Sequence, residues 1–264
     1  MAVTAWSITQ SGRFEPFDLQ VGRGQISWHR NVFKFGIIAS VQTTPQTIWN
    51  AGVEYVFPAA AIQMKVSSSS AADASPSGTG AQTVLIQGLD ADYNEISETI
   101  ALTGQTAVTT VNSYLRINNF EVVSVGSGGT AAGTLYVGTG TVTSGVPATI
   151  YSQIVLLYNA CTEAIFTVPA GYTAYVSSYT FTSGYGNATP VLCSGFLTYS
   201  KNGFFEIQAS ARMNSGNAFD RHFDVPFAVA EKKDIVLKAS AGTGSVVSMT
   251  GEMHILLIKN DANA

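Results

Sequence analysis

Apolar and polar residues alternate along most of this chain. Two stretches show the pattern best, residues 83–104 and residues 165–184, where apolar side chains alternate with Thr, Ser or Gln. A period of two places alternate side chains on opposite faces of a β-strand. Turn sequences interrupt both stretches, Asp-Ala-Asp-Tyr-Asn in the first and Pro-Ala-Gly in the second. Convincing helical periods are missing, so the pattern predicts an all-β fold of antiparallel strands.

The first predicted module covers residues 46–150 and is an antiparallel β-sandwich. Its short strands are separated by turns, at a spacing that is typical of sandwiches. Residues 67–81 are rich in Ser, Ala and Gly, a composition that indicates a flexible surface loop. Strands are predicted near residues 82–87, 95–102, 106–111, 113–117 and 121–125.

The second predicted module covers residues 151–264 and has longer strands. The Gly- and Thr-rich residues 138–148 separate it from the first module, and Asn202-Gly203 is a strong hairpin signal. Long alternating strands joined by short turns favour an antiparallel sandwich of jelly-roll type. Packing in a ring or trimer is one way for such modules to protect their edges. Strands are predicted near residues 163–168, 172–182, 191–200, 204–212, 219–225, 234–239 and 246–258.

Residues 1–45 differ from the rest of the chain. They contain much of its aromatic and basic content, and their alternation is short and broken. This pattern favours an extended N-terminal arm over a packed module. The aromatic side chains of such an arm must be buried against a neighbouring subunit or against the chain's own sandwich, and both readings stay open. The candidate partner-binding residues of the arm are Trp6, Arg13, Phe14, Phe17, Arg23, Trp28 and Arg30.

Charged residues make up only 11% of the chain, against roughly 25% in ordinary soluble domains. A surface this poor in charge is rich in small polar residues or is covered by other subunits. The net charge of −4 and the scattered Lys and Arg residues argue against direct nucleic-acid binding, which needs basic clusters. Apolar runs stay far below the roughly 20 residues of a membrane span, and the N-terminus lacks the pattern of a secretory signal.

Few residues are spaced for metal binding or catalysis. Asp220, His222 and Asp224 would share one face of a strand, as metal ligands could. An exposed polar face is the favoured interpretation, because no Cys or second His has ligand spacing. The acidic residues 90–95 fit a hairpin turn better than a calcium loop. Nucleophile and phosphate-binding motifs are missing as well. We therefore expect no enzymatic activity and no cofactor.

Two cysteines, Cys161 and Cys193, lie in strand-like segments. Two lone thiols favour small buried side chains in a protein made in a reducing compartment. A disulfide between them stays open at this point.

Four segments carry a resemblance to a known group of proteins. They are FDLQVGRGQI (17–26), TVLIQGLDADYNEISETIALTGQTAVTT (83–110), GTLYVGTGTVTSGVPA (133–148), and FTVPAGYTAYV with AEKKDIVLKA downstream. In these segments the chain resembles the virion structural proteins of tailed bacteriophages, particularly marine and cyanobacterial phages. The segments are turn-and-strand patterns and contain no chemical signature.

The resemblance implies a structural component of a phage particle, located in the virion and made in the cytoplasm of the host bacterium. Together with the arm it predicts a head decoration or cement protein that binds the major capsid protein or another virion protein. A homo-oligomer is expected, with a trimer as the favoured count. The alternative is a tail, neck or fibre module that recognises host surface carbohydrate through Tyr179, Tyr185 and Tyr199.

Overall fold

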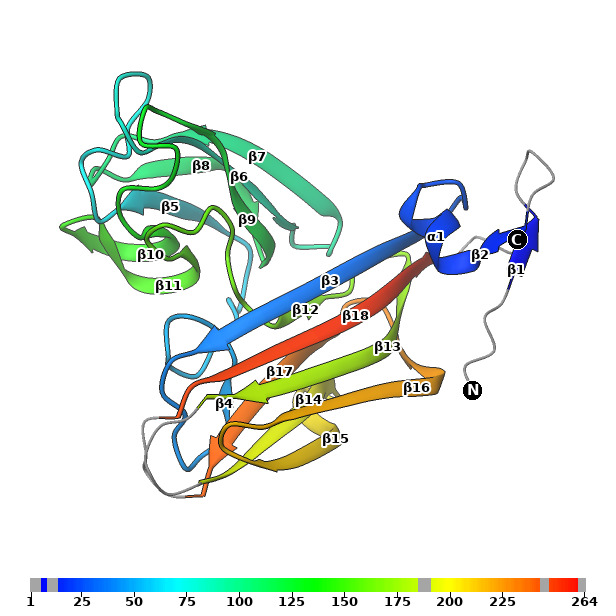
Figure 1. Cartoon of the computed structure of the whole chain (residues 1–264). Helices are drawn as coiled ribbons and strands as arrows, with labels where there is room; N and C mark the ends of the chain where they lie inside the picture. The colour runs from blue at the N-terminus through cyan, green and yellow to red at the C-terminus, as the bar shows by residue number, and fades with distance from the viewer. Residues whose placement is uncertain (1–5, 9–13, 185–190, 243–246, 261–264) are drawn as a thin grey trace.

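The computed structural model describes residues 6–8, 14–184, 191–242 and 247–260. In these residues the chain forms strands β1 to β18 and one short helix, α1 (Phe17–Gly22) (Figure 1). The strand pairs are antiparallel throughout the described sheets. The predicted all-β class is therefore confirmed.

The larger of two units, called the large unit here, contains two sheets. One sheet has the strand order β16-β13-β18-β3, and the other has the order β12-β17-β14-β15, with β4 also paired to β17. Its strands are β3 (His29–Ile38), β4 (Gln46–Thr47), β12 (Ile165–Thr167), β13 (Tyr172–Ser183), β14 (Leu192–Lys201), β15 (Phe204–Asn214), β16 (Ala218–Val229), β17 (Asp234–Ala241) and β18 (Met249–Lys259).

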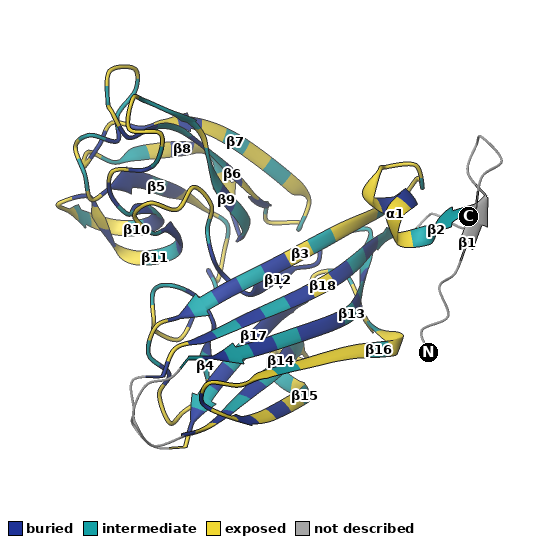
Figure 2. Cartoon of the chain, in the orientation of Figure 1, coloured by how far each residue is buried: buried dark blue, intermediate teal, exposed yellow. Residues whose placement is uncertain are grey.

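One hydrophobic core fills the space between these two sheets. Phe181 of β13 and Leu257 of β18 contribute to it from one side, and Leu197 of β14 and Leu237 of β17 from the other. Buried positions alternate with less buried ones along β13 and β18, whereas β16 is mostly exposed (Figure 2). The period of two in the sequence is thus the alternation between core-facing and outward-facing side chains.

The second unit, called the inserted unit here, lies between β4 and β12 in the sequence. Its sheets have the orders β11-β10-β5-β8 and β7-β6-β9, and apolar residues from both sheets form a separate core. Its strands are β5 (Ile62–Ser68), β6 (Ala81–Leu89), β7 (Glu95–Ala101), β8 (Val108–Tyr114), β9 (Arg116–Val125), β10 (Leu135–Thr143) and β11 (Val146–Ile154).

The predicted arm of residues 1–45 is too long. β3 pairs with β18 along its whole length, from His29 opposite Ile258 to Ile38 opposite Met249. The alternation in β3 looks broken because its buried positions include the charged Lys34 and the small Gly36. A Cβ atom on Gly36 would collide with backbone atoms of two neighbouring segments. The described residues that precede β3, 6–8 and 14–28, stay outside the large unit's sheets, and "the arm" means these residues from here on.

Residues 138–148 do not separate two modules. They belong to the β10–β11 hairpin, whose strands meet at a two-residue turn, Ser144-Gly145. Both turn residues have positive φ angles, 50° and 80°, as the turns that match the twist of a hairpin require. The predicted boundary at residue 150 therefore falls inside β11. The chain has one unit inserted into another, where the sequence predicted two successive modules.

Residues 67–81 form a loop that is tied to neighbouring segments, whereas its composition predicts flexibility. Asp73 is fully buried, and its carboxylate holds the loop together. Its Oδ1 accepts hydrogen bonds from the backbone N–H groups of Ala81 (2.6 Å) and Ala132 (2.8 Å). Its Oδ2 accepts from the Ser68 hydroxyl (2.6 Å) and the Gly133 N–H (2.9 Å). A single buried carboxylate thus orders a segment whose composition alone predicts flexibility.

Candidate interaction surfaces

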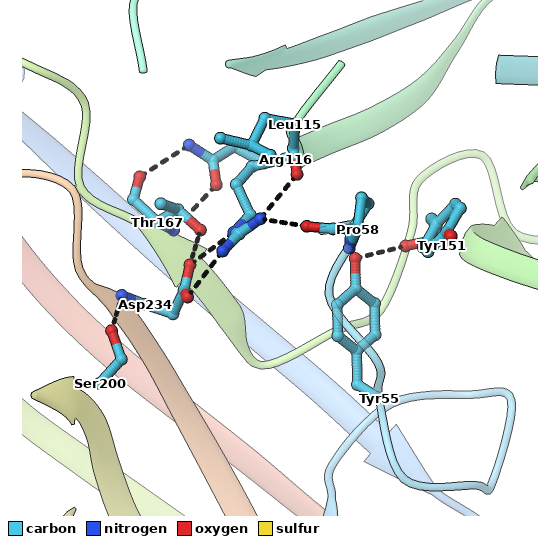
Figure 3. Close-up of polar contacts among 9 residues, drawn as sticks. Tyr55, Pro58, Leu115, Arg116, Tyr151, Thr167, Ser200 and Asp234 are labelled. Atoms are coloured by element: carbon cyan, nitrogen blue, oxygen red, sulfur yellow. Dashed lines mark hydrogen bonds and ion pairs between the residues drawn. The ribbon is translucent and has the colours of Figure 1, made fainter. Parts of the chain in front are cut away.

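A buried ion pair joins the two units. Arg116 begins β9 of the inserted unit, and Asp234 begins β17 of the large unit. The guanidinium donates from Nε to Oδ1 (2.8 Å) and from an Nη atom to Oδ2 (3.1 Å) of Asp234 (Figure 3). It also donates to the carbonyl oxygens of Pro58 (3.1 Å) and Leu115 (2.9 Å). This two-point geometry fixes the direction of both side chains.

Further hydrogen bonds hold Asp234 within the large unit. The Thr167 hydroxyl donates to Oδ1 at 2.6 Å, and the backbone N–H of Asp234 donates to the Ser200 hydroxyl at 2.8 Å. Asn118 of β9 exchanges two hydrogen bonds with the backbone of Thr167, each 2.9 Å long. The contact between the units is therefore a connected polar network in which the charged groups are paired.

An aromatic cluster covers the same junction. Trp49 and Tyr55 lie in the segment that connects β4 to β5 and pack edge-to-face, with ring centroids 5.0 Å apart. The Tyr55 hydroxyl donates to the carbonyl oxygen of Tyr151 at 3.0 Å. The Arg116 guanidinium lies 4.6 Å above the ring of Phe57. The connecting segment thus contacts both units and fills the space between them.

A second pair of buried ionisable groups lies where β3 approaches β9. The Lys34 ammonium donates to the carbonyl oxygen of Asn118 at 2.6 Å. Glu163 is only 2% exposed, and burial raises the pKa of its carboxyl above the ordinary value. The Lys34 charge and the nearby side chains of Ser152 and Cys161 lower that pKa by smaller amounts.

Both cysteines are free thiols. Burial, with the nearby Glu163 charge, raises the pKa of the Cys161 thiol to about 12. Burial also raises the pKa of Cys193. Thiols of this kind are poor nucleophiles near neutral pH.

The arm projects beyond the end of the large unit at the start of β3 (Figure 1). Its strands β1 (Trp6–Ile8) and β2 (Phe14–Pro16) pair with each other, and α1 packs against β3. Of the predicted partner-binding residues, Trp6 begins β1, Phe14 begins β2 and Phe17 begins α1. Arg13 lies outside the described residues.

Other candidate residues of the arm already contact neighbours within the chain. Arg23 forms an ion pair with Glu15 at 3.0 Å. Trp28 is 54% exposed, and the Lys259 ammonium lies 4.7 Å from the centroid of its ring. The first contact lies within the arm, and the second lies where the arm meets β3.

Arg30 has a different position from the one predicted. It belongs to β3, and its guanidinium pairs with the Glu95 carboxylate of the inserted unit at 2.8 Å. It also lies 4.9 Å from the centroid of the Tyr172 ring. Arg30 therefore bridges the two units and does not belong to the arm.

A groove runs between β3 and the inserted unit. Its volume is 510 Å³. Residues of β3 form one wall, and residues of β6, β7 and β9 form the other. The sequence gives no signal for this groove, because its walls come from distant segments. The residues that line it include Arg30, Asn31, Phe33, Gln87, Glu95 and Asn119.

The two described tyrosines of the proposed carbohydrate site do not form an exposed patch. Tyr179 is fully buried and packs against Phe181 and Phe219. Tyr199 is half-buried, and its hydroxyl donates to Glu206 at 3.3 Å. Tyr185 lies outside the described residues. The prediction is wrong for Tyr179, because it lies on the core-facing side of β13.

The candidate metal ligands of β16 lie on an exposed edge strand. His222 Nε2 is 3.5 Å from Asp220 Oδ2, and the Thr180 hydroxyl donates to Oδ1 of Asp220 at 2.7 Å. Over the described ranges, no group of three or more His, Cys, Asp or Glu residues is placed to hold a metal ion. A helix long and apolar enough to cross a membrane is likewise missing from the part of the chain that the structure describes.

The acidic residues at 90–95 form a hairpin turn. Oδ1 of Asp90 accepts hydrogen bonds from the backbone N–H groups of Asp92 and Asn94, both at 2.9 Å. Slight burial raises the pKa of Asp90. The hydrogen bonds together lower that pKa by a larger amount, so it lies below the ordinary value.

Known proteins show little similarity to this chain. No protein-family model matches it, and no curated protein matches it. Among solved structures, particles derived from infectious bursal virus match at 9% identity with a TM-score of 0.25, covering 89% of this chain and 69% of theirs. The VP2 subviral particle of infectious bursal disease virus matches at 6% identity with a TM-score of 0.22, covering 88% and 72%. TM-scores this low do not establish a shared fold.

Proposed function

We propose that this chain is a structural protein of a virus particle, of the tailed-bacteriophage type that its sequence resembles. In this proposal it resides in the virion and decorates the head, where it acts by binding and not by catalysis. Its partner is the major capsid protein or another virion protein. The observation that carries the proposal is a β-sheet body from which an arm projects.

The strand order of the large unit supports a jelly-roll assignment. Taken in chain order, β3 is the first strand and β12 to β18 are the second to the eighth. One sheet then reads first, eighth, third, sixth, and the other reads second, seventh, fourth, fifth. This interleaving is the order of a double Greek-key jelly roll, a fold that viral capsid proteins, lectins and cupins use. The inserted unit, with two sheets around one core, would be a second sandwich.

A fold does not define a function, so the proposed binding role rests on the arm. Its main contact with the large unit is α1 against β3, and β1 lies beyond that contact (Figure 1). Two strands of three residues each are marginally stable alone in water. A projecting hairpin of this size gains stability when it docks onto another protein.

Removal of residues 1–13 tests the proposal, because it deletes β1 and leaves β2, α1 and β3 in place. We expect the truncated protein to keep its fold and to be lost from particles. The measurement is the copy number per particle, from quantitative mass spectrometry of purified virions. Val111→Ser is the matched control, because Val111 is 82% exposed on the inserted unit, away from the arm. Wild-type occupancy of the truncated protein would contradict the docking role.

Cryo-electron microscopy of the same particles separates head decoration from the alternative. Density for this chain on the capsid surface would support the decoration role. Density confined to the tail, neck or fibres would replace it with the alternative role.

A further inference from the structure

We propose that the groove beside β3 is the docking site for strand β1 of a second copy of this chain. The added strand would extend the β16-β13-β18-β3 sheet across the boundary between two subunits. This inference rests on the proposed function in assigning a binding role to the arm, and it places strand β1 in a contact between two copies of this chain.

The edge of β3 that faces the groove carries free backbone groups. The N–H of Lys259 donates to the carbonyl oxygen of Trp28 at 2.9 Å, which fixes the alternation of hydrogen bonds between β3 and β18. Even-numbered residues of β3 therefore bond to β18, and odd-numbered residues point their N–H and C=O groups outward. Asn31 and Phe33 are the odd-numbered residues that line the groove. An edge of this kind is a template for another strand.

The other edges of the large unit are poorer templates. β16 contains Pro226, and its pairing with β13 has a register shift. The pairing of β15 with β14 also has a register shift. β12 has only three residues, and β4 continues its edge. β3, in contrast, pairs with β18 over ten residues without an interruption and contains no proline. Bulges, proline and short strands are the devices that block edge pairing.

The walls of the groove suit an uncharged peptide strand. Three charged side chains line it: Arg30 and Glu95 neutralise each other, and the Lys34 ammonium donates to the carbonyl oxygen of Asn118. The Asn119 amide donates to the Gln87 side-chain oxygen at 3.0 Å, which leaves the Gln87 amide N–H groups available to a ligand. Phe33 is 54% exposed and offers apolar surface beside the free edge. Such a groove combines backbone hydrogen bonds with a contact for an apolar side chain.

Strand β1 is the segment of this chain that fits these requirements. Its sequence, Trp-Ser-Ile, alternates apolar and polar residues and carries no charge. β2 is less suitable, because it contains Glu15 and Pro16, and proline lacks an N–H. The β1–β2 pairing has only three residue pairs. Little free energy is therefore lost when β1 leaves β2 and pairs with β3 of a second copy. In its own chain, β1 lies beyond α1 and away from the groove (Figure 1), which points to a second copy as the acceptor.

Crosslinking between two single variants tests the contact. Ser7→Cys in β1 and Asn31→Cys in β3 are prepared separately, mixed, and treated with a short bismaleimide that tolerates a small error in register. We expect a covalent heterodimer on a denaturing gel. The native thiols give little background, because burial raises the pKa values of Cys161 and Cys193. Ser7→Cys mixed with Val111→Cys is the control. Equal crosslinking in both mixtures, or none in either, overturns the inference.

A proline substitution tests the role of the backbone. Asn31→Pro removes one outward N–H from β3 and leaves the hydrogen bonds to β18 intact, whereas Asn31→Ala keeps that N–H. We expect the dissociation constant of the oligomer to rise about ten-fold for the proline variant and to stay unchanged for the alanine variant. Sedimentation velocity measures both values, and circular dichroism checks the fold. An equal effect of the two variants contradicts strand addition.

The two proposals can fail separately. If removal of residues 1–13 empties the particles while Ser7→Cys and Asn31→Cys do not crosslink, the arm docks on another virion protein, and this inference is wrong. If the crosslink forms and the truncated protein still decorates particles fully, the strand exchange stands, and the capsid-docking role of the arm is wrong.

Discussion

Single charged residues have a large influence on the stability of this protein, because it has so few of them. Arg116 and Asp234 are almost completely removed from water, yet each nitrogen of the guanidinium and each oxygen of the carboxylate has a hydrogen-bond partner. A buried ion pair contributes little more than an apolar contact of the same size, but breaking it leaves an unpaired buried charge. The junction between the units is therefore sensitive to a change in either residue.

Replacing Asp234 by Ala should destabilise the protein strongly. Arg116 would lose both carboxylate contacts, and the Thr167 hydroxyl would lose its acceptor. We expect the free energy of unfolding to fall by about 3–5 kcal/mol, measured by urea denaturation with tryptophan fluorescence. Asp234→Asn keeps an acceptor in place and should lose less. A loss of about 1 kcal/mol or less for Asp234→Ala, as for exposed pairs, would contradict the assignment of a fully desolvated pair.

Glu163 should make stability depend on pH. Its folded pKa lies above the ordinary value of 4.5, so the folded state binds the proton more tightly than the unfolded state. The stabilisation that comes from protonated Glu163 is fully present below pH 4.5. It is lost as the pH rises through the folded pKa. Glu163→Gln removes this loss, so we expect it to be more stable than the wild type at pH 7.

Urea denaturation of the two proteins at pH 4 and pH 7 measures this effect. The advantage of the Gln variant should shrink toward pH 4, where the wild-type carboxyl is protonated in both states. If Glu163→Gln is instead less stable at pH 7, the attraction of Lys34 for the ionised carboxylate outweighs its burial.

At the scale of elements, the strands with a clean alternation could be predicted from the sequence. The expected strands at 82–87, 95–102 and 172–182 match β6, β7 and β13 closely, because each has one buried face. β3 was missed because Lys34 and Gly36 occupy buried positions, where the pattern requires large apolar residues. The sequence predicted three strands between residues 106 and 125. The structure has two, β8 and β9, which lie on either side of Leu115.

The groove and the junction could not be predicted, because they depend on contacts between distant segments. Arg116 and Asp234 are separated by 118 positions, and neither residue lies in a recognisable motif. Asp73 is a similar case, since its partners at Ala132 and Gly133 are about 60 positions away. Local pattern describes which face of a strand is buried, but it contains no information about the segment that covers it.

At the scale of the whole molecule, the low charge limits how copies of the chain can bind each other. Few ion pairs are available for an interface, and exposed pairs contribute only about 0–1 kcal/mol each. Apolar contacts and backbone hydrogen bonds, such as those proposed at β3, must therefore supply most of the binding free energy.

The oligomer should accordingly resist salt and yield to urea. We expect it to persist in about 1 M sodium chloride, where exposed charges are screened within a few ångströms. It should dissociate in moderate urea, which solvates apolar and peptide groups. Size-exclusion chromatography with light scattering measures the mass under each condition. Monomers that appear on salt addition alone would show that the sparse charges dominate the interface.

The insertion between β4 and β12 also affects how the chain matures during synthesis. The strands of the inserted unit are contiguous in sequence, so this unit can fold while the ribosome is still translating the remainder. β3 is made before the inserted unit, but its hydrogen-bonding partner β18 is made after that unit. Until β18 emerges, β3 and β13 have unpaired edges on the same nascent chain. Because this pairing is long-range, we expect it to form slowly, and the unpaired edges of the incomplete chain favour aggregation until it forms.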